Sequence, residues 1–256
     1  MGQKLPIGIQ SFEDLRNKGF KYVDKTAIVY KLADEGKYYF LSRPRRFGKS
    51  LLLNTLESYF LGKRELFDGL AVSELEHDWT EYPVLHLDLN TQQYNTEKAL
   101  RNKINRELTI WESIYGSAAE ELDFGMRFEG VIKRAYERTG RQVVILVDEY
   151  DKPLLQAIGN TELQDAYRAT LKGFYGALKS MDGCIRFAFL TGVTKFGKVS
   201  VFSDLNNLRD ISMLPQYYDI CGITEEELRA NFEVEVAELA SKIGKSVDDT
   251  YAALRE

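Results

Sequence analysis

The sequence predicts an α/β fold in which helices cover both faces of a mostly parallel sheet. The continuous apolar run at residues 143–147 has the composition of a strand that is buried on both faces, and strands are also expected in the aromatic-rich runs at residues 38–41 and 185–190. Helical patterns alternate with these runs, which is typical of this fold class. The 256 residues, of which 44% are hydrophobic, suffice for one full α/β domain with a small appendage.

Two short helical patterns within residues 12–36 precede the first strand, and Asp24 is placed to cap the second of them. The chain is therefore expected to divide into three parts. These are an N-terminal helical strap (1–36), a core (37–215) and a C-terminal helical lid (216–256).

The segment Arg-Pro-Arg-Arg-Phe-Gly-Lys-Ser at residues 43–50 lies between the first strand and a leucine-rich helix expected at residues 50–60. Its second half matches the phosphate-binding motif G-x-x-x-x-G-K-[ST], whereas Arg43 replaces the first glycine. Loop amides, the Lys49 amine and the Ser50 hydroxyl at a helix N-terminus suit phosphates and Mg²⁺. The loop is also rich in cations, for which a triphosphate is a natural counterion. The alternative is a solvated basic turn.

The next elements are a strand at residues 84–89 and two helices, at 96–115 and 128–138. His86 lies in the strand, where a structural role is more common than a catalytic one. The strand at 143–147 then ends in Asp148-Glu149-Tyr150-Asp151.

An aspartate at the end of such a strand can hold Mg²⁺ through water, and a neighbouring glutamate can polarise the water that attacks a γ-phosphate. Asp148 and Glu149 fit these two roles. A polar strand-to-loop transition is the alternative. However, both motifs follow predicted strands directly, and open α/β sheets bind ligands at the carboxyl ends of their strands.

A long helix is expected at residues 162–181, and the strand at 185–190 leads to Thr191. Thr191 is placed to read the γ-phosphate or orient the attacking water, and an ordinary loop role explains it equally well. Thr194 and Lys195 are weaker candidates.

The lid is expected to begin with a capping box, Thr224 with Glu227. The helix that follows would turn Leu228, Phe232, Val236 and Leu239 inward. A further helix from Ser246 reaches the last residue, so we expect a lid that is cut short.

The net charge of −5 gives no support for nucleic-acid binding, although it leaves a local basic groove open. Cys184 and Cys221 form no C-x-x-C pair, and the sequence around Cys184 indicates a core thiol, so we expect a reducing compartment. The N-terminus lacks a signal-peptide pattern, and no apolar stretch approaches the ~20 residues of a membrane span. We therefore expect a cytoplasmic protein.

Five strings together carry a family resemblance: YVDKT (22–26), RPRRFGKS (43–50), VDEYDKP (147–153), TGV (191–193) with FSDLNNL (202–208), and GIT (222–224). With these strings the chain resembles the AAA-ATPase-like family of bacterial proteins. The resemblance implies an ASCE-type P-loop NTPase core of three layers, in which arginine is the usual first residue of the loop. It also implies a nuclease-like domain, related to restriction endonucleases, that usually follows the ATPase and is absent from this chain.

Lys49, Glu149 and Thr191 are thus the predicted catalytic residues, and Ser50 and Asp148 the predicted metal ligands. The predicted nucleotide-binding residues are Arg45, Arg46, Phe47, Gly48, Lys49, Ser50 and Leu51. Residues 6–9 or Tyr22 of the strap are candidates for an adenine pocket, although packing is the favoured explanation for each of them.

We expect a Mg²⁺-dependent ATPase that regulates or powers an attached or partner nuclease-like domain. The alternative is a STAND-like nucleotide-gated switch or binding module with negligible turnover. A small-molecule kinase is less favoured, because a paired glutamate suits water activation better than transfer to an alcohol. An arginine finger could come from Arg45, Arg46 or Arg209, and the sequence neither shows nor excludes an oligomer.

Overall fold

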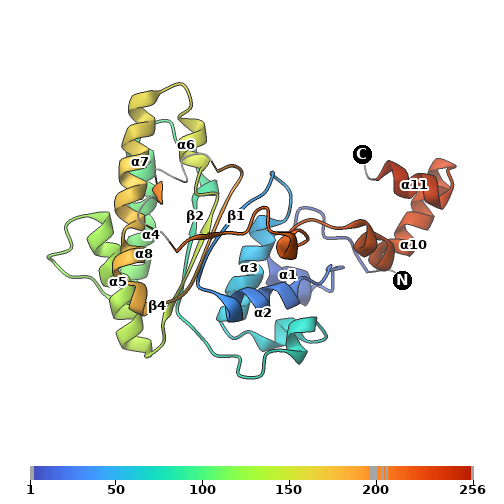
Figure 1. The fold of residues 1–256 in the computed structure, drawn as a ribbon, viewed down its shortest axis with the longest axis horizontal. Coiled ribbons are helices and arrows are strands. Elements are labelled where there is room, and N and C mark those ends of the chain that lie inside the picture. Colours follow the sequence, from blue (N-terminus) through green and yellow to red (C-terminus); the bar gives the residue numbers. More distant parts are fainter. Residues whose placement is uncertain (1–2, 196–200, 203–204, 206, 255–256) are drawn as a thin grey trace.

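A computed structural model describes residues 3–195, 201–202, 205 and 207–254. At its centre is a five-stranded sheet with the order β2-β3-β4-β1-β5, in which every pair of neighbouring strands is parallel (Figure 1). The strands are β1 (Tyr38–Ser42), β2 (Val84–Asp88), β3 (Val143–Asp148), β4 (Ile185–Gly192) and β5 (Arg209–Asp210). The α/β class predicted from the apolar runs is therefore confirmed.

Helices cover both faces of this sheet. One face carries α1 (Phe12–Asn17), α2 (Thr26–Glu35) and α3 (Lys49–Phe60). The other carries α4 (Glu97–Tyr115), α5 (Phe124–Thr139), α7 (Thr161–Tyr175) and α8 (Ala177–Ser180). In β3 the side chains of Val143, Ile145 and Val147 enter one core and those of Val144 and Leu146 the other. Burial on both faces is the reason why this strand is apolar at every position.

Short elements complete the connections between strands. They are α6 (Lys152–Gln156) and the 3₁₀ turns η1 (Arg64–Phe67), η2 (Ala71–Glu74), η3 (Leu89–Thr91) and η4 (Asp182–Cys184). A further 3₁₀ turn, η5 (Pro215–Tyr217), follows β5. Among the described residues, no helix combines the length and the apolar character that crossing a bilayer requires.

Several predicted boundaries were wrong. Helix α5 begins at Phe124 rather than near residue 128, because Asp123 caps it by accepting a 2.9 Å hydrogen bond from the Met126 amide. The long helix expected at residues 162–181 is divided at Gly176 into α7 and α8. Strand β4 continues to Gly192, so that Thr191 belongs to the strand and not to the following loop.

The C-terminal appendage consists of α10 (Glu225–Ile243) and α11 (Val247–Ala253). The capping box is confirmed, since the Thr224 hydroxyl accepts from the Glu227 amide and the Glu227 carboxylate accepts from the Thr224 amide. The expected inward position of Leu239 was wrong, because this side chain is 37% exposed. A non-helical φ of −125° at Phe232 bends α10, so the apolar spacing does not continue along a straight face.

The last helix, α11, starts after Ser246, as expected, but ends at Ala253 with Leu254 as its cap. Figure 1 shows α10 and α11 at the same end of the molecule as the N-terminus. There, the Lys21 ammonium lies 2.5 Å from the Glu235 carboxylate, and Lys25 pairs with Glu227. The division into strap, core and lid stays a prediction.

Candidate functional site

The loop after β1 has a backbone that suits an anion. Gly48, with φ of 85°, is the residue before α3, and Arg46 also has a positive φ of 67°. The left-handed region at Gly48 is accessible to glycine at little cost and strained for most other residues. Helix α3 begins directly afterwards at Lys49, so its free amides and the positive end of its dipole face the loop.

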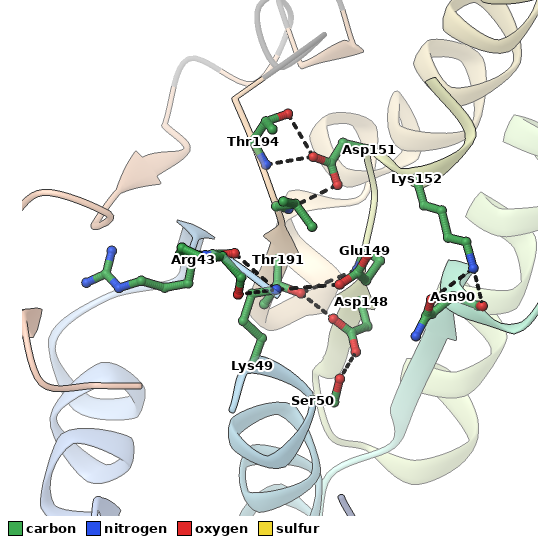
Figure 2. A network of polar contacts seen from close by, with 12 residues as sticks. Arg43, Lys49, Ser50, Asn90, Asp148, Glu149, Asp151, Lys152, Thr191 and Thr194 are labelled. Carbon is green, nitrogen blue, oxygen red and sulfur yellow. Dashed lines mark hydrogen bonds and ion pairs between the residues drawn. The ribbon is translucent and has the colours of Figure 1, made fainter. Parts of the chain in front are cut away.

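The Lys49 side chain is 4% exposed and turns back into this loop. Its ammonium donates hydrogen bonds to the main-chain oxygens of Arg43 (3.1 Å) and Pro44 (3.2 Å). The same ammonium lies 3.5 Å from Oε1 of Glu149. In Figure 2 this cation lies between the loop and the carboxylates at the ends of the central strands.

Asp148, the last residue of β3, receives hydrogen bonds from two other elements. The Ser50 hydroxyl, at the start of α3, donates to Oδ2 at 2.6 Å, and the Thr191 hydroxyl in β4 donates to Oδ1 at 2.5 Å (Figure 2). Strand register explains the second bond, because Val147 is paired with Leu190 and the next residues are therefore level. Asp148 is 4% exposed, so both of its oxygens are held in fixed directions.

Glu149 leaves the strand with a positive φ of 53° and is 8% exposed. Burial raises the pKa of its carboxyl above the ordinary value, Lys49 acts in the opposite sense, and the charges of Asp148 and Asp151 raise it further. The carboxyl is thus a stronger base than a solvated glutamate. It faces the Lys49 ammonium.

Asp151 is a residue whose role the sequence did not indicate. It is fully buried and accepts hydrogen bonds from the Val193 amide (3.2 Å), the Thr194 amide (2.8 Å) and the Thr194 hydroxyl (2.9 Å). It therefore joins the segment after β3 to the segment after β4. Gly192 is required there, because a Cβ at this position would lie 2.6 Å from the Tyr150 ring.

Two adjoining cavities open at the loop. The polar cavity, of about 880 Å³, is lined by Arg45, Arg46, Gly48, Lys49, Ser50, Leu51 and Glu149, among others. The apolar cavity, of about 440 Å³, is lined by Phe47, by Pro6, Ile7, Ile9 and Tyr22 of the strap, and by Ile223 and Phe232 near the C-terminus. They share Ile7, Ile9, Arg46, Gly48 and Leu51, so a ligand with a charged and an apolar part could occupy both.

All seven predicted nucleotide-binding residues line one of these cavities. Asp148 and Thr191 do not line either cavity; Asp148 accepts hydrogen bonds from the hydroxyls of Ser50 and Thr191. Lys152 was missed; it lines the polar cavity and donates to the main-chain and side-chain oxygens of Asn90. Its only sequence signal is its position four residues after Asp148.

The remaining candidates lie elsewhere. The Arg209 guanidinium lies 5.8 Å from the centre of the Tyr217 ring, and Lys195 pairs with Asp210 at 3.0 Å. His86 is held by Glu57, with Nδ1 2.9 Å from the carboxylate, which agrees with a structural role. Burial alone would lower the His86 pKa, but the hydrogen bond and charge of Glu57, with the charges of Asp148 and Asp88, raise it.

Comparison with known sequences decides the family. Residues 6–202 match the AAA-ATPase-like family, which is described as "Predicted AAA-ATPase". The chain belongs to the AAA-ATPase-like family. The matched segment contains the loop, the acidic end of β3 and Thr191. The family resemblance drawn from the five sequence strings is therefore confirmed, although residues 203, 204 and 206 of one string lie outside the described residues.

One curated relative of this AAA-ATPase-like chain is an "Uncharacterized protein in vnfD 5'region" from Azotobacter chroococcum mcd 1. It is 44% identical over 236 residues, which cover 91% of this chain and 46% of the relative. The chain thus spans about half the length of that relative. No solved structure matches this chain.

Proposed function

We propose that this chain binds ATP with Mg²⁺ and hydrolyses the β–γ phosphoanhydride, on an ASCE-type P-loop core. The observation that carries the proposal is the meeting of Lys49, Ser50 and Glu149 at one cavity, with Asp148 bonded to the Ser50 hydroxyl beside it. The sheet order supports the ASCE type, because β4 lies between the loop-bearing β1 and the acid-bearing β3.

The phosphates would lie in the polar cavity against the start of α3. Loop amides, the helix dipole and the Lys49 ammonium all favour negative charge at that point. Arg45 and Arg46 add two exposed cations to the same wall. The base would enter the apolar cavity, where Ile7 is 90% exposed and Phe47 is 46% exposed.

The oxygen donors at the site fit Mg²⁺. This ion takes hard oxygen ligands and often combines one or two protein groups with phosphate oxygens and water. Ser50 Oγ and an Asp148 carboxylate oxygen are already 2.6 Å apart and would hold it directly or through water. The ion, when bound, neutralises charge that develops on the transferred phosphoryl group.

Glu149 would act as the general base toward the attacking water. Its raised pKa makes it a better proton acceptor than a solvated glutamate. In this structure its carboxylate forms an ion pair with the Lys49 ammonium. A triphosphate competes for the same ammonium, so that binding would free the glutamate for water. Thr191 would hold the Asp148 carboxylate and thereby the metal.

We further propose that ATP turnover regulates or powers a nuclease-like domain, attached or separate, in a reducing cytoplasmic setting. The greater length of the curated relative leaves room for a further domain, and the nuclease-like character is what the family resemblance implies. The two free thiols, Cys184 and Cys221, agree with a reducing setting. The alternative, a nucleotide-gated switch with negligible turnover, is favoured by the Lys49–Glu149 ion pair, which keeps the base occupied.

The test measures phosphate release by the purified chain with and without Mg²⁺, and with added single- or double-stranded DNA. Wild type should release phosphate only with Mg²⁺. Glu149→Gln should lose roughly 10²-fold or more in turnover while retaining its affinity for ATP. Lys49→Ala should lose affinity, whereas Lys133→Ala, at an exposed ion pair on α5, should change neither. Negligible release by both wild type and Glu149→Gln, with intact binding, would favour the switch.

A further inference from the structure

Arg43, the residue in place of the motif's first glycine, has a side chain that avoids the polar cavity. Figure 2 shows it directed away from Lys49, Asp148 and Glu149. Its guanidinium donates to the main-chain oxygens of Ser212 and Tyr217, the second at 3.2 Å. A motif-based interpretation treats this arginine as a tolerated defect, whereas these contacts give it a defined task.

The contacts of Arg43 fix one end of the loop to the segment of residues 212–222, here called the connector. A second bond reinforces them, because the Ser42 amide donates to the Ser212 hydroxyl at 2.9 Å. Ser212 is 4% exposed, so this junction lies inside the protein. The Arg43 amide also donates to the Gly192 oxygen of β4 at 3.2 Å, which anchors its backbone to the sheet.

The other end of the loop touches the far end of the connector. A Cβ on Gly222 would lie 3.5 Å from the Phe47 ring, and Gly222 has a φ of 85° that favours glycine. Two residues later, Thr224 caps α10. The connector therefore links both ends of the phosphate loop to the start of α10.

A nucleotide in the polar cavity would act on Arg43 through Lys49. Its main-chain oxygen now accepts a hydrogen bond from the Lys49 ammonium at 3.1 Å. Phosphate oxygens would attract that ammonium and withdraw it from the Arg43 oxygen. One residue thus senses Lys49 through its backbone and holds the connector through its side chain.

We propose that Arg43 is a positioning residue that sets the geometry of the phosphate loop and transmits nucleotide occupancy through the connector to α10. The receiving helix is suited to respond, because Phe232 lines the apolar cavity and Glu227 and Glu235 pair with Lys25 and Lys21 of the strap. This inference rests on the proposed function, since it requires a nucleotide in the polar cavity.

The decisive variant is Arg43→Gly, which restores the glycine of the common motif. Affinity for a fluorescent ATP analogue and hydrogen exchange with and without non-hydrolysable ATP are measured on the full chain. In wild type, nucleotide should slow exchange both in the loop and in the connector and first turns of α10. Arg43→Gly should weaken affinity about tenfold, as expected for losing charge-assisted hydrogen bonds. In this variant, saturating nucleotide should still slow hydrogen exchange in the loop but no longer in the connector and α10.

Arg43→Lys provides a second variant that keeps the charge but lacks the planar fork, which donates to two carbonyls at once. It should recover part of the affinity and little of the distant protection. Arg138→Ala is the matched control, because Arg138 also donates to a main-chain oxygen, that of Ile114, on the α4–α5 side of the sheet. It should behave as wild type, and thermal melts establish that each variant is folded.

The outcomes separate two failures. If wild type binds no nucleotide, the proposed function fails and this inference with it. If wild type binds and protects the connector, but Arg43→Gly and Arg43→Lys do the same with unchanged affinity, the assignment of Arg43 alone is overturned.

Discussion

The Ser50 hydroxyl lies 2.6 Å from Oδ2 of Asp148, although 98 positions separate the two residues in the chain. One belongs to the first turn of α3 and the other to the end of β3. The hydroxyl hydrogen is donated to the carboxylate, which leaves the oxygen lone pairs of Ser50 available to a cation. Removal of this one oxygen should therefore affect metal use more than nucleotide contact.

Ser50→Ala should raise the Mg²⁺ concentration needed for half-maximal turnover by about 10- to 100-fold, the usual cost of losing a metal-site group. Ser50→Thr retains the hydroxyl and should stay near wild type. The measurement is a Mg²⁺ titration of phosphate release, with affinity for the ATP analogue determined in EDTA. Equal Mg²⁺ dependence in the alanine and threonine variants would contradict a metal role for Ser50.

Thr191 is expected to act through Asp148 and not on the phosphate alone. Thr191→Val is nearly isosteric but removes the hydroxyl that donates to Oδ1 of Asp148. We expect the Mg²⁺ concentration needed for half-maximal turnover to rise by about 10-fold, as in Ser50→Ala. Thr191→Ser should restore the response. If valine lowers turnover at every Mg²⁺ concentration by the same factor, Thr191 contacts the reacting phosphate instead.

The raised pKa of Glu149 should appear in the pH profile of turnover. Because the base must be ionised, kcat/KM should rise with pH, with a midpoint above the ordinary carboxyl value of 4.5. Burial is the largest cause of that displacement. Kinetics over a pH series measure the midpoint, and this acidic limb should be absent from the residual activity of Glu149→Gln. A limb that persists unchanged in the glutamine variant would assign the proton to another group.

His86 and Glu57 should make the free energy of unfolding depend on pH. The folded-state pKa of His86 is raised, so its stabilisation is fully present below the unfolded value of 6.5 and is lost as pH rises through the raised value. Glu57→Gln should thus cost about 1 kcal/mol near pH 6 and less near pH 9. Urea unfolding at both pH values provides the measurement.

The control for that experiment is Glu137→Gln, which makes the same charge change in an exposed pair with Lys133 on α5. Its effect should be small at both pH values. A loss for Glu57→Gln that is equal at pH 6 and pH 9 would mean that His86 does not titrate with folding in this range.

The central strands and the loop residues at the polar cavity, although not Lys152, could be predicted because their signals are local. Burial on both faces makes β3 apolar throughout, and the loop residues from Gly48 to Ser50 are adjacent in the chain. Parallel strands also end at one edge of the sheet, which brings Asp148 and Thr191 together without knowledge of the loops.

Other contacts could not be predicted because they depend on how distant segments meet. Asp151 reads as one more polar residue after a strand until the amides of residues 193 and 194 are placed beside it. The same holds for Arg43, whose acceptors are carbonyl oxygens 169 and 174 positions away, and a main-chain oxygen leaves no mark in the sequence. The inward position expected for Leu239 was wrong for a different reason, because a backbone bend at Phe232 interrupts the helical period.

The place of β1 between β4 and β5 has a consequence for synthesis on the ribosome. Tyr39 of β1 pairs with Phe189 and with Arg209, so both of its neighbours emerge long after it. Until then its two edges have no hydrogen-bonding partners, and unpaired apolar edges invite association with other chains. Nascent chains that end before β4 should thus need chaperone protection until both neighbours of β1 are available.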